Sequence, residues 1–322
     1  MTELTVLVLA RPDDEGLRRL EALPSGVRAV VGGRLEDFTA AAPHADVLLY
    51  FSGAGRELLE QVWEAAPRLR WVHSRSAGVD GVLFPALVES PVPLTNSRGV
   101  FSRSLAEFVL ASVLYFAKGL RRMVDSQAAG RWDPFPPEMV QGRTLGIVGY
   151  GDIGRETARA ARAVGMRVLA LRRQPPAAGD DLAHEIVGPE GLHGLLGRAD
   201  YVVLATPLTA ETRGLIDARA LAAMQRRAVL INVGRGAVVD EPALIEALQE
   251  RRIRGAALDV FAQEPLPEGH AFYRLENVLL SPHCADQVEG WLTEATDAFL
   301  ENLERFRAGQ PLQNVVDKTR GY

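Results

Sequence analysis

The chain has 322 residues, a length that suits about two domains of the usual ~100–200 residues each. Hydrophobic residues make up 47% and charged residues 24% of the chain, a mix typical of a folded globular protein that excludes a disordered or collagen-like chain. The net charge of −5 provides no broad basic surface, so we expect no nucleic-acid partner. Lys118 and Lys318 are the only lysines, and the excess of arginine alone carries no functional meaning.

A single cysteine, Cys284, excludes an internal disulfide and any cysteine cluster for zinc or an iron–sulfur centre. We expect it to be a small buried residue, and we expect no bound metal. The N-terminal sequence favours a first strand over a signal peptide because no basic segment precedes its short apolar run. The apolar stretch between Glu107 and Lys118 is too short to cross ~30 Å of hydrocarbon. These features predict a cytoplasmic chain without a membrane partner.

Short apolar runs alternate with segments of helical composition along the chain. The runs are rich in Val, Ile and Leu without polar alternation, as is typical of parallel strands buried on both faces. They form two series, which predict two doubly wound α/β sheets and hence two domains. The first series covers residues 5–10, 29–32, 46–51 and 69–74, and the second covers 144–149, 167–171, 201–206, 228–233, 255–260 and 277–281.

Two long helices predict how the domains are connected. An apolar helix at 104–123 lies between the two series of strands. A last helix at 288–306 has an apolar residue at every third or fourth position, which gives it one buried stripe. Because this helix follows the final strand of the second series, we expect it to pack on the first domain. The predicted domains are therefore 1–98 with 287–322, and 99–286.

A glycine-rich turn follows the first strand of the second series and opens a helix predicted at 155–164. In this context the pattern GxGxxG indicates a dinucleotide-binding turn. Gly149 allows the tight turn, Gly151 lets a pyrophosphate approach the backbone, and Gly154 permits close packing of helix on strand. We expect the backbone N–H groups of Asp152 and Ile153 to bind the anion at the positive end of the helix.

The strand at 167–171 runs directly into Arg172 and Arg173. NAD-binding chains carry an acidic residue near this position for the ribose 2′-hydroxyl, whereas here no carboxylate occurs before Asp180. Two guanidinium groups suit a 2′-phosphate, which they bind through charge-assisted hydrogen bonds. We therefore predict NADP(H) as the cofactor. NAD(H) is the alternative if both arginines are only solvated strand-end residues.

Ionisable side chains follow three later strands of the second series, at the edge where open α/β sheets bind ligands. Arg235 follows one strand, Asp259 and Glu264 follow the next, and His283 follows the last. An arginine binds a carboxylate, a histidine transfers protons near neutral pH, and a carboxylate orients that histidine. These residues are the candidate catalytic set.

The chain resembles the D-isomer-specific 2-hydroxyacid dehydrogenases over nearly its whole length and in the same motif order. The resemblance implies a Rossmann NAD(P)-binding domain inserted in a discontinuous, flavodoxin-like substrate domain, with the active site between the two. The matching motifs are residues 76–80, 149–154, 205–209, 232–236, 259–266 and 281–283.

The resemblance also implies a role for each matching residue. Arg235 would bind the substrate's carboxylate and carbonyl, His283 would deliver the proton to the carbonyl oxygen, and Glu264 would keep His283 protonated. The backbone N–H groups of Ala77 and Gly78 would bind the substrate carboxylate. Asp259 would bind the nicotinamide carboxamide, and the residues lining the cofactor would also include Thr206, Pro207, Val233, Gly234, Arg235 and His283.

We therefore expect an NADPH-dependent reductase of a small 2-oxo acid such as glyoxylate or hydroxypyruvate. The resemblance alone implies a homodimer. One alternative keeps the fold but acts on a bulkier 2-oxo acid or on phosphite with NAD(H). Another is a non-catalytic, dinucleotide-sensing or co-repressor-like binding module. Asp286 stands where the family commonly has a glycine, and its effect on substrate choice is left open.

Overall fold

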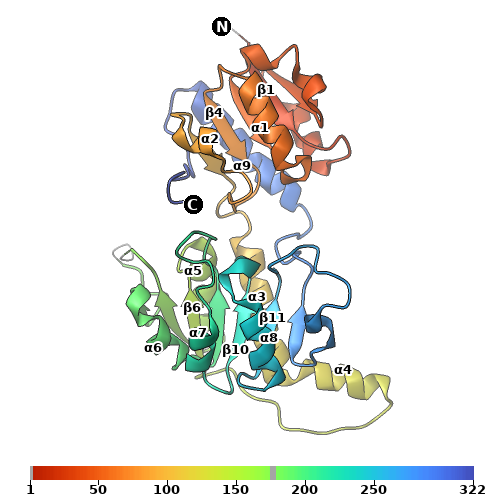
Figure 1. Cartoon of the computed structure of the whole chain (residues 1–322), viewed down its shortest axis with the longest axis vertical. Coiled ribbons are helices and arrows are strands. Elements are labelled where there is room, and N and C mark those ends of the chain that lie inside the picture. The colour runs from red at the N-terminus through yellow and green to blue at the C-terminus, as the bar shows by residue number, and fades with distance from the viewer. Residues whose placement is uncertain (1–2, 175–178) are drawn as a thin grey trace. The chain divides into compact units, whose positions relative to one another are not determined.

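The computed structural model describes residues 3–174 and 179–322, and the chain divides into two units. The smaller unit is formed by Met1–Val100 together with Glu289–Tyr322, and the larger unit by Phe101–Val288. Residues 1–2, at the start of the chain, and 175–178, after Arg172 and Arg173, lie outside the described residues. Figure 1 shows the helices and strands of both units.

A five-stranded parallel sheet forms the centre of the smaller unit. Its strands are β1 (Leu4–Leu9), β2 (Val27–Gly32), β3 (Val47–Tyr50), β4 (Trp71–Ser74) and β5 (Leu94–Asn96). They lie in the order β2-β1-β3-β4-β5, which is the order of flavodoxin-like sheets. The interior residues of β1, β3 and β4 are buried, as expected for strands that are covered on both faces.

The C-terminal helix α9 (Trp291–Arg307) covers one face of this sheet. Its Phe299 stacks on Trp71 of β4 with ring centroids 5.2 Å apart. The segment after α9 returns to the sheet edge, where the N–H of Val316 donates to the carbonyl of Leu94 on β5. The other helices of the unit are η1 (Glu15–Ala22), η2 (Leu35–Phe38), η3 (Ala42–His44), η4 (Ser52–Ala54), α1 (Arg56–Ala65) and α2 (Pro85–Glu89).

A seven-stranded parallel sheet forms the centre of the larger unit. Its strands are β6 (Thr144–Val148), β7 (Arg167–Leu171), β8 (Glu185–Val187), β9 (Tyr201–Leu204), β10 (Val229–Asn232), β11 (Gly255–Leu258) and β12 (Val278–Leu280). The order β12-β11-β10-β9-β6-β7-β8 is that of a Rossmann fold. The order reverses between β6 and β9, where such sheets bind dinucleotides beyond the carboxyl ends of the strands.

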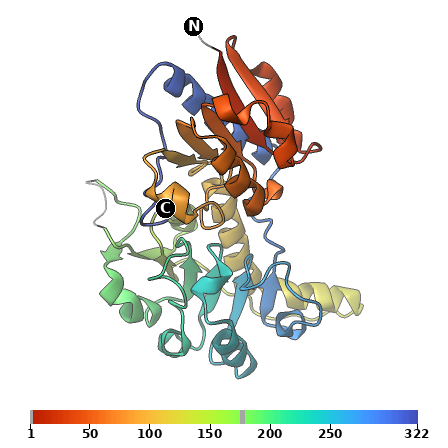
Figure 2. The ribbon, with the colours of Figure 1, turned by 45° about the horizontal axis from the view of Figure 1, so that its top comes forward.

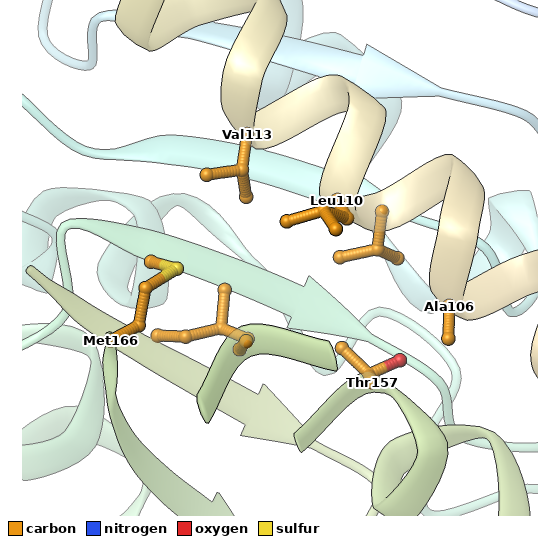
Figure 3. Close-up of a pocket in the computed structure, with 8 residues that line it drawn as sticks. Ala106, Leu110, Val113, Thr157 and Met166 are labelled. Atoms are coloured by element: carbon orange, nitrogen blue, oxygen red, sulfur yellow. The ribbon is translucent and has the colours of Figure 1, made fainter. Parts of the chain in front are cut away.

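Helices cover both faces of the larger sheet (Figure 1). Figure 3 shows a small apolar cavity where α3 packs over α5, with Ala106, Leu110 and Val113 facing Thr157 and Met166. No titratable side chain lines this cavity, so it is a packing gap rather than a ligand site. The helices are α3 (Ser102–Lys118), α4 (Leu120–Ala128), α5 (Asp152–Ala163), α6 (Leu192–Leu196), α7 (Ala218–Ala223), α8 (Glu241–Gln249), η5 (Pro189–Gly191), η6 (Gly236–Val238) and η7 (Ala271–Arg274).

The helix predicted at 104–123 is two helices, α3 and α4, which are separated by Gly119. Gly119 has a φ of 61°, a left-handed conformation that ends α3 and that other residues rarely adopt. A Cβ at residue 119 would also lie only 2.8 Å from the nearest carbon of the Phe135 ring, which is too close for van der Waals contact. As a result, α4 and the following irregular segment extend away from the sheet (Figures 1 and 2).

The predicted fold class of two parallel α/β sheets is confirmed. The prediction missed β5 and β8 because each strand has only three residues, too few to form a recognisable apolar run. Among the described residues, no helix combines the length and hydrophobicity that a bilayer-spanning segment requires.

Candidate active site

The three glycines of the turn after β6 differ in how much space surrounds them. Gly149 has a φ of 102°, and a Cβ there would lie 2.6 Å from the backbone of Ala205. A Cβ at Gly154 would collide with the carbonyl oxygen of Gly149. At Gly151, by contrast, a Cβ would meet no atom within 4 Å. The first and third glycines are therefore required by packing, while the space beside the second is open to a ligand.

Helix α5 begins at this turn without a side-chain cap. Gly151 occupies the N-cap position, so Asp152 and Ile153 present backbone N–H groups at the helix terminus. The neighbouring helices α7 and α8 differ, because Asp217 and Asp240 cap them through their carboxylates. Of these three termini, that of α5 is the one without a side-chain cap, and the N-terminus of a helix favours an anion.

Arg172 directly follows β7 and is half-buried, and its N–H donates to the carbonyl of Val187 at 3.0 Å. Arg173 is exposed. Asp180, the first carboxylate after β7, is almost fully buried and accepts a hydrogen bond from the Tyr150 hydroxyl at 3.1 Å. It also forms an ion pair with Arg155 of α5. The carboxylate is therefore engaged by the residues of the glycine turn and of α5, while the arginines occupy the strand end.

The ends of β9 and β10 complete the edge beside the glycine turn. The Oγ1 atom of Thr206 is buried and has no hydrogen-bond partner among the described residues. Pro207 is exposed, and its carbonyl accepts from the Thr212 hydroxyl at 2.6 Å. Val233 is buried, and its N–H donates to the carbonyl of Leu204 at 3.1 Å. A buried hydroxyl without a partner is costly, so Thr206 marks a place where a ligand's polar group would be favourable.

His283 and Glu264 form a close pair, with His283 Nδ1 2.6 Å from Glu264 Oε2. This hydrogen bond to Glu264 raises the pKa of His283 above its usual value and outweighs the opposing effect of burial. Burial by itself would raise the pKa of Glu264. Hydrogen bonds from His283 and from the N–H of Phe261 outweigh it, so the pKa of Glu264 is lowered. The pair therefore favours a charged imidazolium beside a carboxylate.

The buried carboxylate of Asp259 holds the loop that carries His283. Its Oδ1 accepts hydrogen bonds from the Ser281 hydroxyl at 2.6 Å and from the N–H groups of Cys284 and Ala285 at 3.0 and 3.1 Å. The N–H of His283 donates to the Asp259 carbonyl at 2.9 Å. His283 itself has a φ of 52°, an uncommon conformation for a residue other than glycine. The loop is thus held on both sides of the histidine.

Arg235 follows β10 and is half-buried, with Nη1 2.8 Å from the carbonyl of Gly234. Its positive charge contributes to the pKa values of Glu264, His283 and Asp286, so all four groups lie within electrostatic range of one another. The pKa of Asp286 is raised, first by burial and then by the nearby Asp259 carboxylate, against the opposing charges of His283 and Arg235. The larger unit therefore brings the predicted catalytic residues together at one edge of its sheet.

Ala77 and Gly78 belong to the smaller unit, in the loop after β4. Both are half-buried. Two asparagines to which the sequence assigned no role fix loops, each within its own unit. Asn232 accepts from the N–H of Gly234 at 3.1 Å and donates to the carbonyl of Arg235 at 3.0 Å, and Asn96 donates to the carbonyl of Ala77. Their position at the last residue of a strand was the available signal.

The prediction for Cys284 is wrong, because the thiol is exposed. Its N–H donates to the buried carboxylate of Asp259, but its side chain lies at the surface. Across the described ranges 3–174 and 179–322, no group of three or more His, Cys, Asp or Glu residues is arranged to hold a metal ion.

Replacing Asp259 by alanine tests the anchoring of the histidine loop. Asp259→Ala leaves the N–H groups of Cys284 and Ala285 and the Ser281 hydroxyl without their acceptor, and we expect it to lower the free energy of unfolding by roughly 2–4 kcal/mol. Ser281→Ala removes only one of the three donors and should cost about 1 kcal/mol. Urea unfolding of both variants measures the difference. Equal, small losses would show that the loop does not depend on the carboxylate.

Comparison with known proteins identifies relatives along the whole chain. Residues 110–285 match the family described as D-isomer specific 2-hydroxyacid dehydrogenase, NAD binding domain. A glyoxylate reductase from Korarchaeum cryptofilum is 38% identical over 271 residues, which are 80% of this chain and 79% of that protein. A D-isomer specific 2-hydroxyacid dehydrogenase from Xanthobacter autotrophicus Py2, solved with NADPH and MES, is 33% identical with a TM-score of 0.83 and 100% coverage of both chains.

A further solved relative is an NADPH-dependent glyoxylate/hydroxypyruvate reductase from Sinorhizobium meliloti in complex with NADP and sulfate, with 28% identity, a TM-score of 0.86 and 100% coverage of both chains. The family match alone covers more than half of this chain and spans both the glycine turn and His283. These matches confirm the resemblance that the motifs indicated. The chain therefore belongs to the D-isomer-specific 2-hydroxyacid dehydrogenases, and it is an oxidoreductase that uses a nicotinamide dinucleotide.

Proposed function

We propose that this enzyme reduces small 2-oxo acids of the glyoxylate and hydroxypyruvate type to D-2-hydroxy acids, with NADPH as the reductant. The observation that carries the proposal is the His283–Glu264 pair, 2.6 Å apart and within electrostatic range of Arg235. A protonated imidazole and a guanidinium are the groups that a carbonyl and a carboxylate require during reduction. The names of the glyoxylate reductase relatives support the substrate class.

In the proposed reaction each candidate residue has its own role in binding the substrate or transferring the proton. Arg235 binds the substrate carboxylate and polarises the carbonyl, and the N–H groups of Ala77 and Gly78 bind the carboxylate from the smaller unit. His283 donates the proton that the carbonyl oxygen takes up, and Glu264 stabilises the imidazolium before that transfer. When bound, the dinucleotide supplies a hydride to the carbonyl carbon of the substrate.

The glycine turn fits a dinucleotide. The open space at Gly151 and the uncapped N–H groups of Asp152 and Ile153 suit a pyrophosphate. The buried, unpartnered Thr206 hydroxyl offers a donor to the same ligand. We propose that the nicotinamide end of the dinucleotide lies against residues that follow β9, β10, β11 and β12. These residues are Pro207, Val233, Gly234, Arg235, Asp259 and His283.

Steady-state reduction tests the proposal directly. The decay of nicotinamide absorbance is measured with NADPH and with NADH against glyoxylate, hydroxypyruvate, bulkier 2-oxo acids and, for oxidation, phosphite with NAD⁺. We expect turnover of the small 2-oxo acids, and a loss of roughly 10²–10⁴-fold in kcat for His283→Ala with dinucleotide binding retained. Dinucleotide binding without turnover of any substrate would instead favour a non-catalytic sensing module.

The rate of reduction should depend on pH through His283. Because the raised pKa of His283 keeps the proton donor charged, reduction is fast below that pKa and falls as the pH rises through it. Glu264→Gln removes the negative charge, so the pKa of His283 falls and the decline moves to lower pH. Glu241→Gln is the matched control, since Glu241 accepts from the N–H of Ala262 and does not contact His283. Identical pH profiles for all three enzymes would rule out this proton donor.

We infer that Arg172 selects NADPH by binding its 2′-phosphate. Arg172→Gln should raise the KM for NADPH about 10–100-fold, since a hydrogen bond to a charged group contributes about 1.5–3 kcal/mol, and should leave the KM for NADH nearly unchanged. Arg167→Gln, at the opposite end of β7, serves as the control. An unaltered ratio of kcat/KM for NADPH and NADH would exclude this role for Arg172.

We further propose that the enzyme is a homodimer that associates through α4 and the segment after it. Val124, Trp132 and Met139 are exposed there, and the Trp132 side chain is 97% exposed. The segment is held in place by Arg122. Its guanidinium forms a bidentate ion pair with Asp133, with both hydrogen bonds 2.7 Å long, and lies over the ring of Phe135. A rigid apolar surface of this kind favours association.

Light scattering tests the oligomeric state. Trp132→Asp combined with Val124→Asp should convert the dimer into a monomer, because both substitutions place a charge in the apolar contact. Val31→Asp, at an exposed apolar residue of the smaller unit, should leave the dimer intact. A monomeric wild-type chain would contradict the proposal.

A further inference from the structure

Two consecutive carbonyl groups of the loop after β4 are bound by the end of β5. The N–H of Ser97 donates to the carbonyl of Ser76 at 3.3 Å. The side chain of Asn96 donates through Nδ2 to the carbonyl of Ala77 at 2.6 Å. Both carbonyls therefore face two consecutive residues of the same strand end.

The direction of these carbonyls sets the direction of the N–H groups. In a trans peptide the C=O and N–H point in opposite directions, and among the described residues the one cis peptide bond is Glu264–Pro265. The peptide units that end in the N–H groups of Ala77 and Gly78 thus turn both donors away from β5. Within the described part of the chain neither N–H makes a hydrogen bond. Two successive donors on one side form a concave anion-binding site.

Asn96 is itself held rigidly. It is 5% exposed, and its own N–H donates to the carbonyl of Asn314 in the C-terminal segment at 3.3 Å. Its Oδ1 accepts from the N–H of Arg98 at 3.3 Å. Since a carbonyl can only accept and an N–H can only donate, the Arg98 N–H at Oδ1 and the Ala77 carbonyl at Nδ2 together fix the orientation of the side-chain amide.

The residues before and after Asn96, Thr95 and Ser97, both direct their side chains to the buried His73, on the other side of the chain from Asn96, because successive side chains of an extended segment alternate. The Thr95 hydroxyl lies 2.7 Å from Nδ1 of the buried His73, and the Ser97 hydroxyl lies 3.4 Å from its Nε2. Burial lowers the pKa of His73 to about 3, so this histidine stays neutral near neutral pH. The strand end that carries Asn96 therefore keeps one arrangement over the working range of pH.

We propose that Asn96 is a positioning residue that holds the Ala77–Gly78 peptide unit in the orientation that binds the substrate carboxylate. Asn96 touches no substrate; it acts through the carbonyl of Ala77. This inference rests on the proposed reduction of 2-oxo acids. It adds a residue of the smaller unit that sets affinity for the carboxylate group common to the whole substrate class.

Asn96→Asp and Asn96→Ala test the inference. The aspartate keeps the shape of the side chain but replaces the donor with a negatively charged acceptor facing the Ala77 carbonyl. We expect the KM for the 2-oxo acid to rise about 10-fold, or one decade per 1.4 kcal/mol, while kcat changes less than about 3-fold. The KM for NADPH should stay the same. Asn96→Ala should also raise the KM for the 2-oxo acid while kcat changes little, but the rise in KM should be smaller than for Asn96→Asp.

Asn277→Asp is the matched control for a merely structural effect. Asn277 is a buried amide of the larger unit that donates to the carbonyls of Leu248 and Arg254 at 3.2 and 3.3 Å. Its variant should lower the melting temperature to a similar extent without changing the KM for the 2-oxo acid. Equal rises in KM for the two aspartate variants would overturn the role of Asn96.

Oxalate binding separates this inference from the proposed reaction, because oxalate offers the carboxylate without undergoing reduction. Calorimetry on the full chain loaded with NADP⁺ should show about 10-fold weaker binding of oxalate to Asn96→Asp than to the wild type. That result with no turnover of any 2-oxo acid would support Asn96 and refute the proposed reaction. Turnover by the wild type with the same oxalate affinity in both proteins would refute the role of Asn96 alone.

Discussion

The buried carboxylate of Asp259 is the interaction on which the arrangement of the candidate site depends. A parallel strand ends with backbone N–H groups that no neighbouring strand accepts, and these groups must find partners or water. Asp259 supplies one acceptor for three donors in the loop after β12, so two strand ends are joined through a single oxygen. Asn232 fixes the turn after β10, because its side chain accepts from the N–H of Gly234 and donates to the carbonyl of Arg235. The ionisable residues beyond these anchors therefore have little freedom of position.

Charge coupling is the second constraint at this edge. His283 lies among Glu264, Asp259, Asp286 and Arg235, and the net effect is a histidine that holds its proton more strongly than usual. Two carboxylates of this network, Glu264 and Asp286, have pKa values that shift in opposite directions. Glu264 is stabilised as an anion by two hydrogen bonds, whereas Asp286 resists ionisation because it is buried near another carboxylate. Such separation of neighbouring pKa values is characteristic of sites that transfer protons.

Local sequence predicted the elements whose signal is long or chemically specific. Apolar runs of four or more residues indicated the central strands, and the glycine turn was recognisable because it lies between an apolar run and a segment of helical composition. Strands β5 and β8 escaped detection because neighbours in space, rather than their own three residues, make them strands. The break at Gly119 was missed because the apolar pattern continues past it, whereas its φ of 61° and the close approach of the Phe135 ring are visible only in the structure.

Hydrogen-bond partners far apart in sequence were beyond this kind of prediction. Asn96 and Ala77 are 19 positions apart, and Asp259 and Ala285 are 26 apart. Only the parallel arrangement of the strands brings these groups within reach. The sequence could therefore name ionisable residues as candidates, and the structure places Arg235, Glu264 and His283 near one another, but the sequence could not identify the amides and hydroxyls that orient the backbone around them.

The uncapped start of α5 has a consequence for the thermodynamics of the whole chain. A dinucleotide that fills those N–H groups binds the folded chain and not the unfolded one, so the free energy of unfolding increases with the concentration of free ligand. At one hundred times the dissociation constant this linkage adds about 2.7 kcal/mol. The fraction of enzyme that is folded at equilibrium then depends on the size of the nicotinamide pool around it as well as on its own packing.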